Sequence, residues 1–403
     1  MTIKKSKSPF DRVIGGYGAL AISIGGVIGS GIFFILGIAA GAAGSGVILS
    51  IFFAGIIALL TAFSFVTLSK KMTREGGEYD FVYEVFGARI GYLVGLMWIA
   101  ATVFAGVTVS LAFASYLIAI LPIAPVNIVA AGTCIAFMLL DILGLKLSSD
   151  IESVLSIVKI GVLLLFIAIA LPAVHTANLG GLFAKGYNGL LIAAFLIFFA
   201  YAGFGKVAAA AEEVGSPKKA IPRAILYAVV IAFVLYLAVT IAAVGAVGAG
   251  TLASPSFSGA PLASVMLALG SDWGFLIILI GALAATSSVL IVELLGVSRT
   301  IYAMARNNQL PLFLSAVHPR LKTPYRAEII IGLAMACMAL VINVVTVVGL
   351  TGLGMLLYYC VINLAALYMR RKDRKRFGLW DLGSVLGAVS CAFLIAYFLS
   401  TLL

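Results

Sequence analysis

The sequence predicts an all-α integral membrane protein, a bundle of eleven transmembrane helices. Of its 403 residues, 63% are hydrophobic and only 10% are charged, which leaves too little polar surface for a soluble domain. The apolar residues form long continuous runs, whereas a β-barrel would show short alternating segments. Two of these runs, five spans apart, are interrupted by glycine, which indicates an internal repeat.

The span boundaries follow from the length of the apolar runs. A hydrocarbon core of about 30 Å requires roughly 20 apolar residues in each helical span. Reading the runs between charged or turn-rich breaks predicts the ranges 13–37, 46–68, 90–119, 127–145, 152–172, 188–211, 223–248, 274–305, 327–345, 347–369 and 381–402. No Ser/Pro-rich linker or soluble segment separates them, so residues 1–403 are expected to form a single transmembrane domain.

The distribution of Lys and Arg predicts the orientation. With the N-terminus inside, 23 of the 26 basic residues fall on the cytoplasmic side, in segments 4–12, 70–89, 146, 218–223, 299–326 and 370–376. This asymmetry favours a cytoplasmic N-terminus, an extracellular C-terminus and a plasma-membrane location. It also accounts for the net charge of +11, because these residues face anionic lipid, so nucleic acid is not an expected partner.

The interrupted runs define the repeat. The first run carries IGGVIGSGIF at 24–33, the sixth carries AGFG at 202–205, and the third and eighth runs are both unusually long. Because five spans is an odd number, the second repeat must be inverted relative to the first, giving repeats 1–172 and 188–369 with 381–402 as an additional span. Glycine within one span indicates close helix packing, but a symmetric pair of breaks is typical of secondary transporters with a site near the bilayer midplane.

Four stretches carry a family resemblance. They are GSGIF at 29–33, FFAYAGFG at 198–205, EEVGSPKKAIPRAI at 212–225, and SR at 298–299 followed by YAMARNNQLP at 302–311. In this order they resemble the amino acid–polyamine–organocation (APC) superfamily, and the chain is similar to its prokaryotic proton-coupled amino acid permeases. The resemblance covers nearly the whole chain. It implies a LeuT-like fold and a substrate that is an amino acid or related amine, although many members have twelve spans.

The breaks supply the expected substrate site. Where the first helix unwinds, backbone N–H groups lie at the positive end of the following half-helix, which suits a substrate carboxylate. Freed carbonyls in both breaks would accept from the α-ammonium, and glycine permits the close approach. The expected carboxylate donors are Gly29, Ser30 and Gly31, and the expected carbonyls are those of Val27, Phe199 and Ala202.

Aromatic side chains next to the second break are expected to close the site. Phe199 matches the aromatic gate residue of the family, and Tyr201 and Phe204 are near it in the sequence. We expect Phe199 to cover the substrate, Tyr201 to take part in gating and Phe204 to contact the substrate. The alternative for each ring is ordinary packing within the bundle.

An inner gate is predicted at the cytoplasmic mouth. Glu212 and Glu213 follow the sixth span, and Arg299 closes the eighth. Pairing between these charges, or with Arg306, would seal the inner side of the pathway, whereas the alternative is that they are solvated loop charges.

Lys159 is the predicted coupling residue. It lies nine residues after Asp150, about 14 Å along a helix, near the centre of the bilayer. It resembles the fifth-span lysine of proton-coupled family members, whose amine takes the place of a sodium ion. The expected partners are the carbonyl of Gly26 or a neighbour and the hydroxyls of Thr286, Ser287 and Ser288. Protonation would tie these elements together; the alternative is a permanently charged structural lysine.

Two further charges are predicted inside the bundle. Glu293 lies in the middle of the eighth span and is assigned to the proton-coupling group, and Lys206 directly follows the sixth-span break. An unpaired buried charge is costly, so each is expected to have a partner. The sequence leaves open whether Glu293 pairs with Lys206 or with Lys159, and whether Lys206 instead favours an acidic substrate.

The function predicted from these observations is secondary active transport of amino acids by alternating access, with the proton as coupling ion and no cofactor or metal. The alternatives are an exchanger without obligatory proton coupling, a channel or a sensor. An enzyme is not expected, because the sequence has no HExxH, GxSxG or Walker spacing and its two histidines fall in loops on opposite sides. The expected partners are the small-molecule substrate and membrane lipid, with no obligatory protein partner.

Overall fold

The computed structural model describes residues 14–72, 77–122, 124–143, 149–211, 213–321, 323–373 and 377–401. Within these ranges every regular element is a helix, and the only extended pairing is an isolated bridge between Ile14 and Val214. The prediction of an all-helical protein is therefore confirmed.

Long helices follow the order of the predicted spans. The first half contains α1 (Gly16–Val27), a π-helical turn η1 (Gly31–Ile35), α2 (Leu36–Ala43), α3 (Val47–Ser69), α4 (Gly77–Phe86), α5 (Ala88–Ile120), α6 (Val126–Ile142) and α7 (Ser149–Ala170). The second half contains α8 (Gly186–Tyr201), a 3₁₀ segment η5 (Phe204–Ala210), α9 (Pro217–Val247), α10 (Ala249–Leu252), α11 (Pro255–Ser258), α12 (Pro261–Ala268), α13 (Asp272–Arg306), α14 (Tyr325–Val341), α15 (Val344–Lys372) and α16 (Leu379–Ser400).

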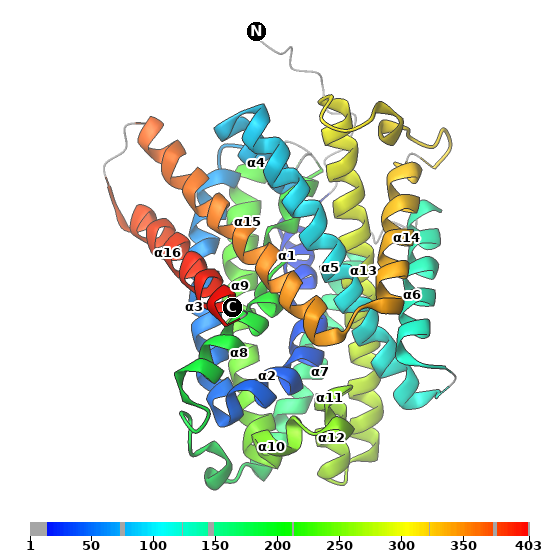
Figure 1. Cartoon of the computed structure of the whole chain (residues 1–403), viewed down its shortest axis with the longest axis vertical. Helices are drawn as coiled ribbons and strands as arrows, with labels where there is room; N and C mark the ends of the chain where they lie inside the picture. The colour runs from blue at the N-terminus through cyan, green and yellow to red at the C-terminus, as the bar shows by residue number, and fades with distance from the viewer. Residues whose placement is uncertain are drawn as a thin grey trace.

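These helices identify a multi-pass membrane protein. Each of the eleven predicted ranges overlaps one of the long helices or, at the two breaks, the shorter helices on either side. Among the described residues, eight helical segments are long and apolar enough to cross a membrane, and one of them, Gly16–Ser69, includes both the interrupted first helix and α3. Helices α4 and α10 to α12 were not predicted, and they lie at opposite ends of the bundle (Figure 1).

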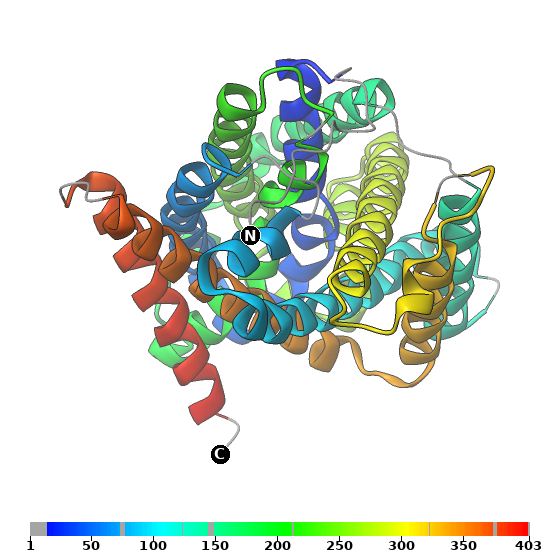
Figure 2. The ribbon, with the colours of Figure 1, turned by 90° about the horizontal axis from the view of Figure 1, so that it is seen from above.

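Helices five spans apart pack against each other. Contacts join α3 to α9, α5 to α13 and α6 to α14, while α1 contacts η5 and α2 contacts α8. Seen along the bundle, α16 lies at one edge and the α6–α14 pair at the opposite edge (Figure 2). The residues on both sides of each helix break are buried.

Small residues allow the outer helices to approach closely. At Gly354 of α15, an added Cβ would lie 2.6 Å from the Cβ and 3.1 Å from the Cα of Ala101 on α5. Small residues have this role at membrane-helix contacts, where packing has to replace the hydrophobic effect. In contrast, no atom of the described residues lies within 4 Å of the position of a Cβ on Gly161 of α7.

This difference predicts the response to a larger side chain. Gly354→Leu should destabilise the fold by ~1–3 kcal/mol, because overpacking forces the backbones of α5 and α15 apart. Gly161→Leu, the matched control on an open face, should leave stability unchanged. Thermal melting of the two purified variants in detergent measures the effect, and equal melting temperatures would contradict the packing argument.

Candidate functional site

The two helix breaks meet at a pair of glycines. Helix α1 ends at Val27 and η1 begins at Gly31, whereas α8 ends at Tyr201 and is followed by Gly203 with φ +103°. That φ strongly favours glycine. A Cβ on Gly26 would lie 2.6 Å from the carbonyl oxygen of Gly203, and a Cβ on Gly203 would overlap the carbonyl of Gly26. The irregular backbones therefore touch only because neither residue has a side chain.

The predicted carboxylate donors lie at the start of η1. The first N–H groups of a helix have no carbonyl one turn earlier to bind, so Gly29, Ser30 and Gly31 are placed as donors. Ser30 is 1% exposed, and its hydroxyl has no hydrogen-bond partner among the described residues. Gly29 faces Val289 of α13 and Gly31 faces Ala200 of α8, so neither position has space for a side chain. This group of donors suits a small anion such as a carboxylate.

Two of the predicted carbonyl acceptors already have partners. The hydroxyl of Tyr236 on α9 lies 2.9 Å from the carbonyl of Val27 and 3.2 Å from that of Ala200, so it spans both interrupted helices. The carbonyl of Phe199 accepts from the N–H of Ala202 at 3.0 Å. Sequence reasoning missed Tyr236; the only available signal was a phenol in the middle of an apolar span, which usually requires a partner.

The three aromatic residues near the second break have different surroundings. Phe199 is buried beside the break. The Tyr201 hydroxyl donates to the carbonyl of Ile51 on α3 at 3.1 Å, and the ring of Phe204 packs against Phe65 and Tyr359, with centroids 5.1 and 5.4 Å away. Tyr201 and Phe204 thus contribute to helix packing in this conformation, and the gating role of Phe199 stays a prediction.

Lys159 lies in a fully buried polar cluster. Its Nζ is 2.8 Å from the Oγ of Ser288, 3.2 Å from the carbonyl oxygen of Gly25 and 3.3 Å from Oε1 of Glu152. Its side chain is 0% exposed and that of Glu152 is 2% exposed. Ammonium has three N–H donors, so these three acceptors satisfy it completely. The cluster joins α1, α7 and α13.

One face of α7 builds this cluster. Glu152, Ser156 and Lys159 are spaced by four and three residues, so they share a helix face, and the Ser156 hydroxyl donates to the carbonyl of Ala21 on α1 at 3.0 Å. The Lys159 ammonium lies at the C-terminal end of α1, where the helix dipole is negative and carbonyls lack helical partners. Helix α7 thus supplies a positive charge and one hydrogen bond to the end of α1, while Tyr236 of α9 supplies another.

The structure selects among the expected partners of Lys159 and corrects two of them, Thr286 and Ser287. The accepting carbonyl belongs to Gly25, the neighbour of Gly26, whereas Gly26 itself faces Gly203. Of the three hydroxyls on α13, only that of Ser288 reaches the cluster. Successive helical side chains point about 100° apart, so Thr286 and Ser287 face elsewhere and donate to carbonyls of Ala282 and Leu283 in their own helix.

Glu152 was not predicted, although among the described residues it is the only carboxylate in the cluster. Its carboxylate lies within 2.8 Å of the Ser288 hydroxyl, and Gly25 leaves the space it occupies. The available signal was its position seven residues before Lys159, on the same helix face.

Glu293 pairs with Lys206, so the choice that the sequence left open is resolved. The Nζ of Lys206 lies 2.5 Å from Oε1 of Glu293, and both side chains are less than 10% exposed. The pair joins η5, directly after the second break, to α13. The second carboxylate oxygen of Glu293 is buried and has no hydrogen-bond partner among the described residues.

Two contacts hold the segment between η5 and α9 in place, at the end of the bundle near the N-terminus. Glu213 and Arg299 form an ion pair at 3.7 Å, and each is about a quarter exposed. The backbone of Ile14 donates to Glu213 and accepts from Gly215, both at 3.0 Å. The pairing predicted for Glu213 is present, whereas Glu212 lies outside the described residues.

Comparisons with known proteins give one family. The family model described as amino acid permease matches residues 14–401. An uncharacterised transporter of Mycobacterium tuberculosis is 34% identical over 95% of this chain and 86% of its own length. The branched-chain amino acid permease of Bacillus subtilis is 31% identical over 90% of this chain and 82% of its own. The methylthioribose transporter of the same organism is 31% identical over 91% and 83%.

The contacts of Tyr236 predict the effect of removing its hydroxyl. Tyr236→Phe should leave the carbonyls of Val27 and Ala200 without this donor, at a cost of ~1–3 kcal/mol, and should lower the melting temperature. Tyr227→Phe, on an exposed position of the same helix, is the control and should have no effect. If the two variants melt alike, the hydroxyl does not hold the breaks together.

Proposed function

We propose, from the premise that this chain belongs to the amino acid permease family, that it is a secondary active transporter of amino acids working by alternating access. The observation that carries the proposal is the meeting of two interrupted helices at Gly26 and Gly203, with backbone donors and carbonyls gathered beside it. Half-helix ends of this kind bind the charged groups of a substrate without a charged side chain.

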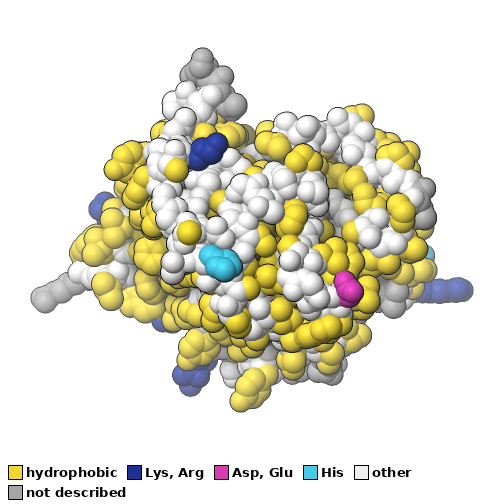
Figure 3. Space-filling view, turned by 90° about the horizontal axis from the view of Figure 1, so that it is seen from below, with side chains coloured by type: hydrophobic (Ala, Val, Ile, Leu, Met, Phe, Trp, Pro, Cys, Tyr) yellow, Lys and Arg dark blue, Asp and Glu magenta, His cyan; other side chains and the backbone are white. Residues whose placement is uncertain are grey.

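The proposed architecture is a LeuT-like five-plus-five inverted repeat with eleven spans. It is supported by the pairwise packing of α3 with α9, α5 with α13 and α6 with α14, and by the contacts of α1 with η5 and of α2 with α8. The end bearing α10 to α12 carries few charged side chains (Figure 3). We assign that end to the outside and the N-terminal end to the cytoplasm of a plasma-membrane protein.

For the substrate, we propose an amino acid with an uncharged side chain. The N–H groups at Gly29 to Gly31 would receive its carboxylate, and the carbonyl of Ala202 its ammonium. Lys206 is neutralised by Glu293, so it offers no free cation to an acidic side chain. Similar proteins are named for substrates that range from branched-chain amino acids to methylthioribose, so the relatives alone do not select the side chain.

The proposed coupling step is release of α1 from α7 and α13. When Lys159 is protonated, its ammonium binds the carbonyl of Gly25 and holds the end of α1. When Lys159 gives its proton to water, this charge-assisted bond is lost. Glu152 and Ser288 remain bonded at 2.8 Å, so α7 and α13 stay together while α1 becomes free to move.

Exchange without obligatory proton coupling is the second candidate, and one observation favours it. Glu152 supplies Lys159 with a buried counter-ion, which stabilises the charged amine and would make the cluster a permanent structural tie. The variant Lys159→Ala distinguishes proton-coupled transport from exchange.

Reconstituted protein should take up labelled amino acids saturably, and an inward proton gradient should stimulate the uptake. In Lys159→Ala the stimulation should disappear while counterflow of labelled substrate against unlabelled substrate persists, because exchange needs no net proton movement. The measurement is uptake into proteoliposomes with and without an imposed pH gradient, with Lys185→Ala as a control outside the bundle.

Each possible result of the uptake experiment favours a different function. Full gradient stimulation in Lys159→Ala would reject its coupling role and favour the structural interpretation. Counterflow in the native protein without any response to pH would favour the exchanger. Sustained currents with no stoichiometric substrate movement would reject transport altogether and indicate a channel.

We expect substitutions of Lys206 and Glu293 to have non-additive effects on stability. Glu293→Gln should reduce uptake by at least tenfold and lower stability by ~3–5 kcal/mol, because Lys206 is left as a buried charge without a counter-ion. The double variant Lys206→Met/Glu293→Gln should recover stability. Uptake, its pH profile and melting of the single and double variants measure the coupling between the two sites. If Glu293→Gln changes neither uptake nor its pH dependence, Glu293 is a structural residue.

A further inference from the structure

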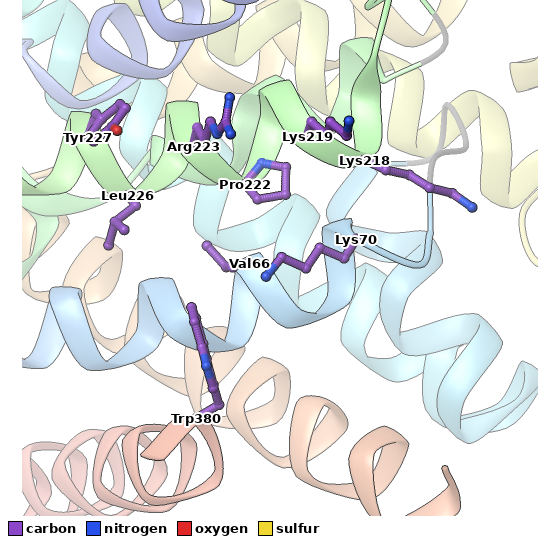
Figure 4. A pocket seen from close by; sticks show the side chains of 9 residues that line it. All are labelled: Val66, Lys70, Lys218, Lys219, Pro222, Arg223, Leu226, Tyr227 and Trp380. Atoms are coloured by element: carbon purple, nitrogen blue, oxygen red, sulfur yellow. The ribbon is translucent and has the colours of Figure 1, made fainter. Parts of the chain in front are cut away.

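A basic pocket lies away from the helix breaks, at the N-terminal end of α9. It has a volume of about 300 Å³ and is bounded by α3, α9 and Trp380 of α16 (Figure 4). This volume is at the lower end of the range of small-ligand pockets. Four cations line it, namely Lys70, Lys218, Lys219 and Arg223.

Among the described residues, these four cations have no acidic partner. The described ion pairs lie elsewhere. Lys70 instead lies over the ring of Trp380, with its Nζ 4.9 Å from the ring centroid. The pocket therefore concentrates positive charge that is open to an anion from outside the chain.

The position of the cations in α9 is electrostatically unfavourable for the helix alone. The N-terminal end of a helix is positive and is normally stabilised by acidic residues, yet the first turn of α9 has none and carries Lys218 and Lys219. A bound anion would offset both the helix dipole and the lysines, and phosphate suits such a position.

The surface beside the pocket is apolar. Arg223, Tyr227, Val230 and Val234 are spaced by four, three and four residues, so they share one face of α9. The last three are 54%, 42% and 59% exposed. A ligand that fills the pocket with its charged group can therefore lay a hydrocarbon chain along α9 towards the middle of the bilayer. Free phosphate would use the cations and leave this stripe uncovered.

We propose that this pocket binds the phosphate headgroup of an anionic phospholipid, with one acyl chain along the exposed face of α9. Basic pockets between transmembrane helices on the cytoplasmic side have the charge to select such lipids over zwitterionic ones. Trp380 also lines the pocket, and tryptophan side chains prefer the boundary between headgroups and hydrocarbon. The bound lipid would bridge α9 and α16 across α3.

The test measures lipid binding to the purified full-length chain in detergent. The probes are phosphatidylglycerol, phosphatidylcholine with the same acyl chains, and inorganic phosphate. Native mass spectrometry gives the affinity and thermal melting gives the stabilisation. Lys218→Gln/Arg223→Gln removes two pocket charges, and Arg89→Gln/Arg320→Gln removes two exposed charges outside the pocket as the matched control.

Phosphatidylglycerol should bind the native chain and the control equally, and the pocket variant about 25-fold more weakly, since each basic residue near an anionic lipid contributes about fivefold. Equal binding of phosphatidylcholine, equal weakening in the control, or no binding to the native chain would overturn the proposal. Competition by millimolar inorganic phosphate that removes the lipid completely would identify a soluble-anion site and also overturn it.

Location of the site is checked independently of affinity. Phosphatidylglycerol with brominated acyl chains should quench tryptophan fluorescence in the native chain, and the quenched fraction should fall in Trp380→Phe, because Trp98 is buried and Trp273 lies at the other end of the bundle. Quenching that is the same in Trp380→Phe would place the lipid elsewhere and reject the pocket.

Discussion

The bond between the ammonium of Lys159 and the carbonyl of Gly25 is the contact on which the arrangement of the site depends. A buried ammonium is tolerated only when each of its protons has an acceptor and its charge has a counter-ion. Glu152, Ser288 and the end of α1 supply these together. Gly25 must lack a Cβ to leave space for the carboxylate. The charge on Lys159 thus explains a glycine in α1, a carboxylate seven residues earlier in α7 and a serine in α13.

Helix α13 carries the polar contacts from the breaks to the end of the bundle near the N-terminus. Ser288 binds the Lys159 cluster, Glu293 binds Lys206 of η5, and Arg299 binds Glu213 after η5. These three positions cover about 16 Å at 1.5 Å per residue. The two interrupted helices are consequently tied to one continuous helix. A displacement of either broken helix relative to α13 has to break an ion pair or a charge-assisted hydrogen bond.

Local patterns in the sequence predicted the helix breaks and the buried charged residues. The partners of these charged residues depend on tertiary structure. Glycines within apolar runs located both interruptions, and a lysine in the centre of a span indicated burial, since both signals are properties of one segment. Glu152 and Tyr236 were missed because their roles depend on which helix face meets α1. Thr286 was placed wrongly for the same reason. The composition of an apolar run does not show which residues of α13 face α7.

Charge balance supports the proposal that the proton on Lys159 is coupled to helix movement. Lys159 with Glu152, and Lys206 with Glu293, are each neutral as pairs, and a zwitterionic amino acid adds no net charge to the site. Movement of either broken helix with bound substrate therefore carries little electrostatic cost through the apolar interior. Loss of the proton from Lys159 changes this, because Glu152 then remains as an uncompensated buried carboxylate. That state is destabilised while the bundle stays closed, and it is relieved when α1 moves and water reaches the cluster. In this proposal, proton release and helix movement favour each other for a purely electrostatic reason.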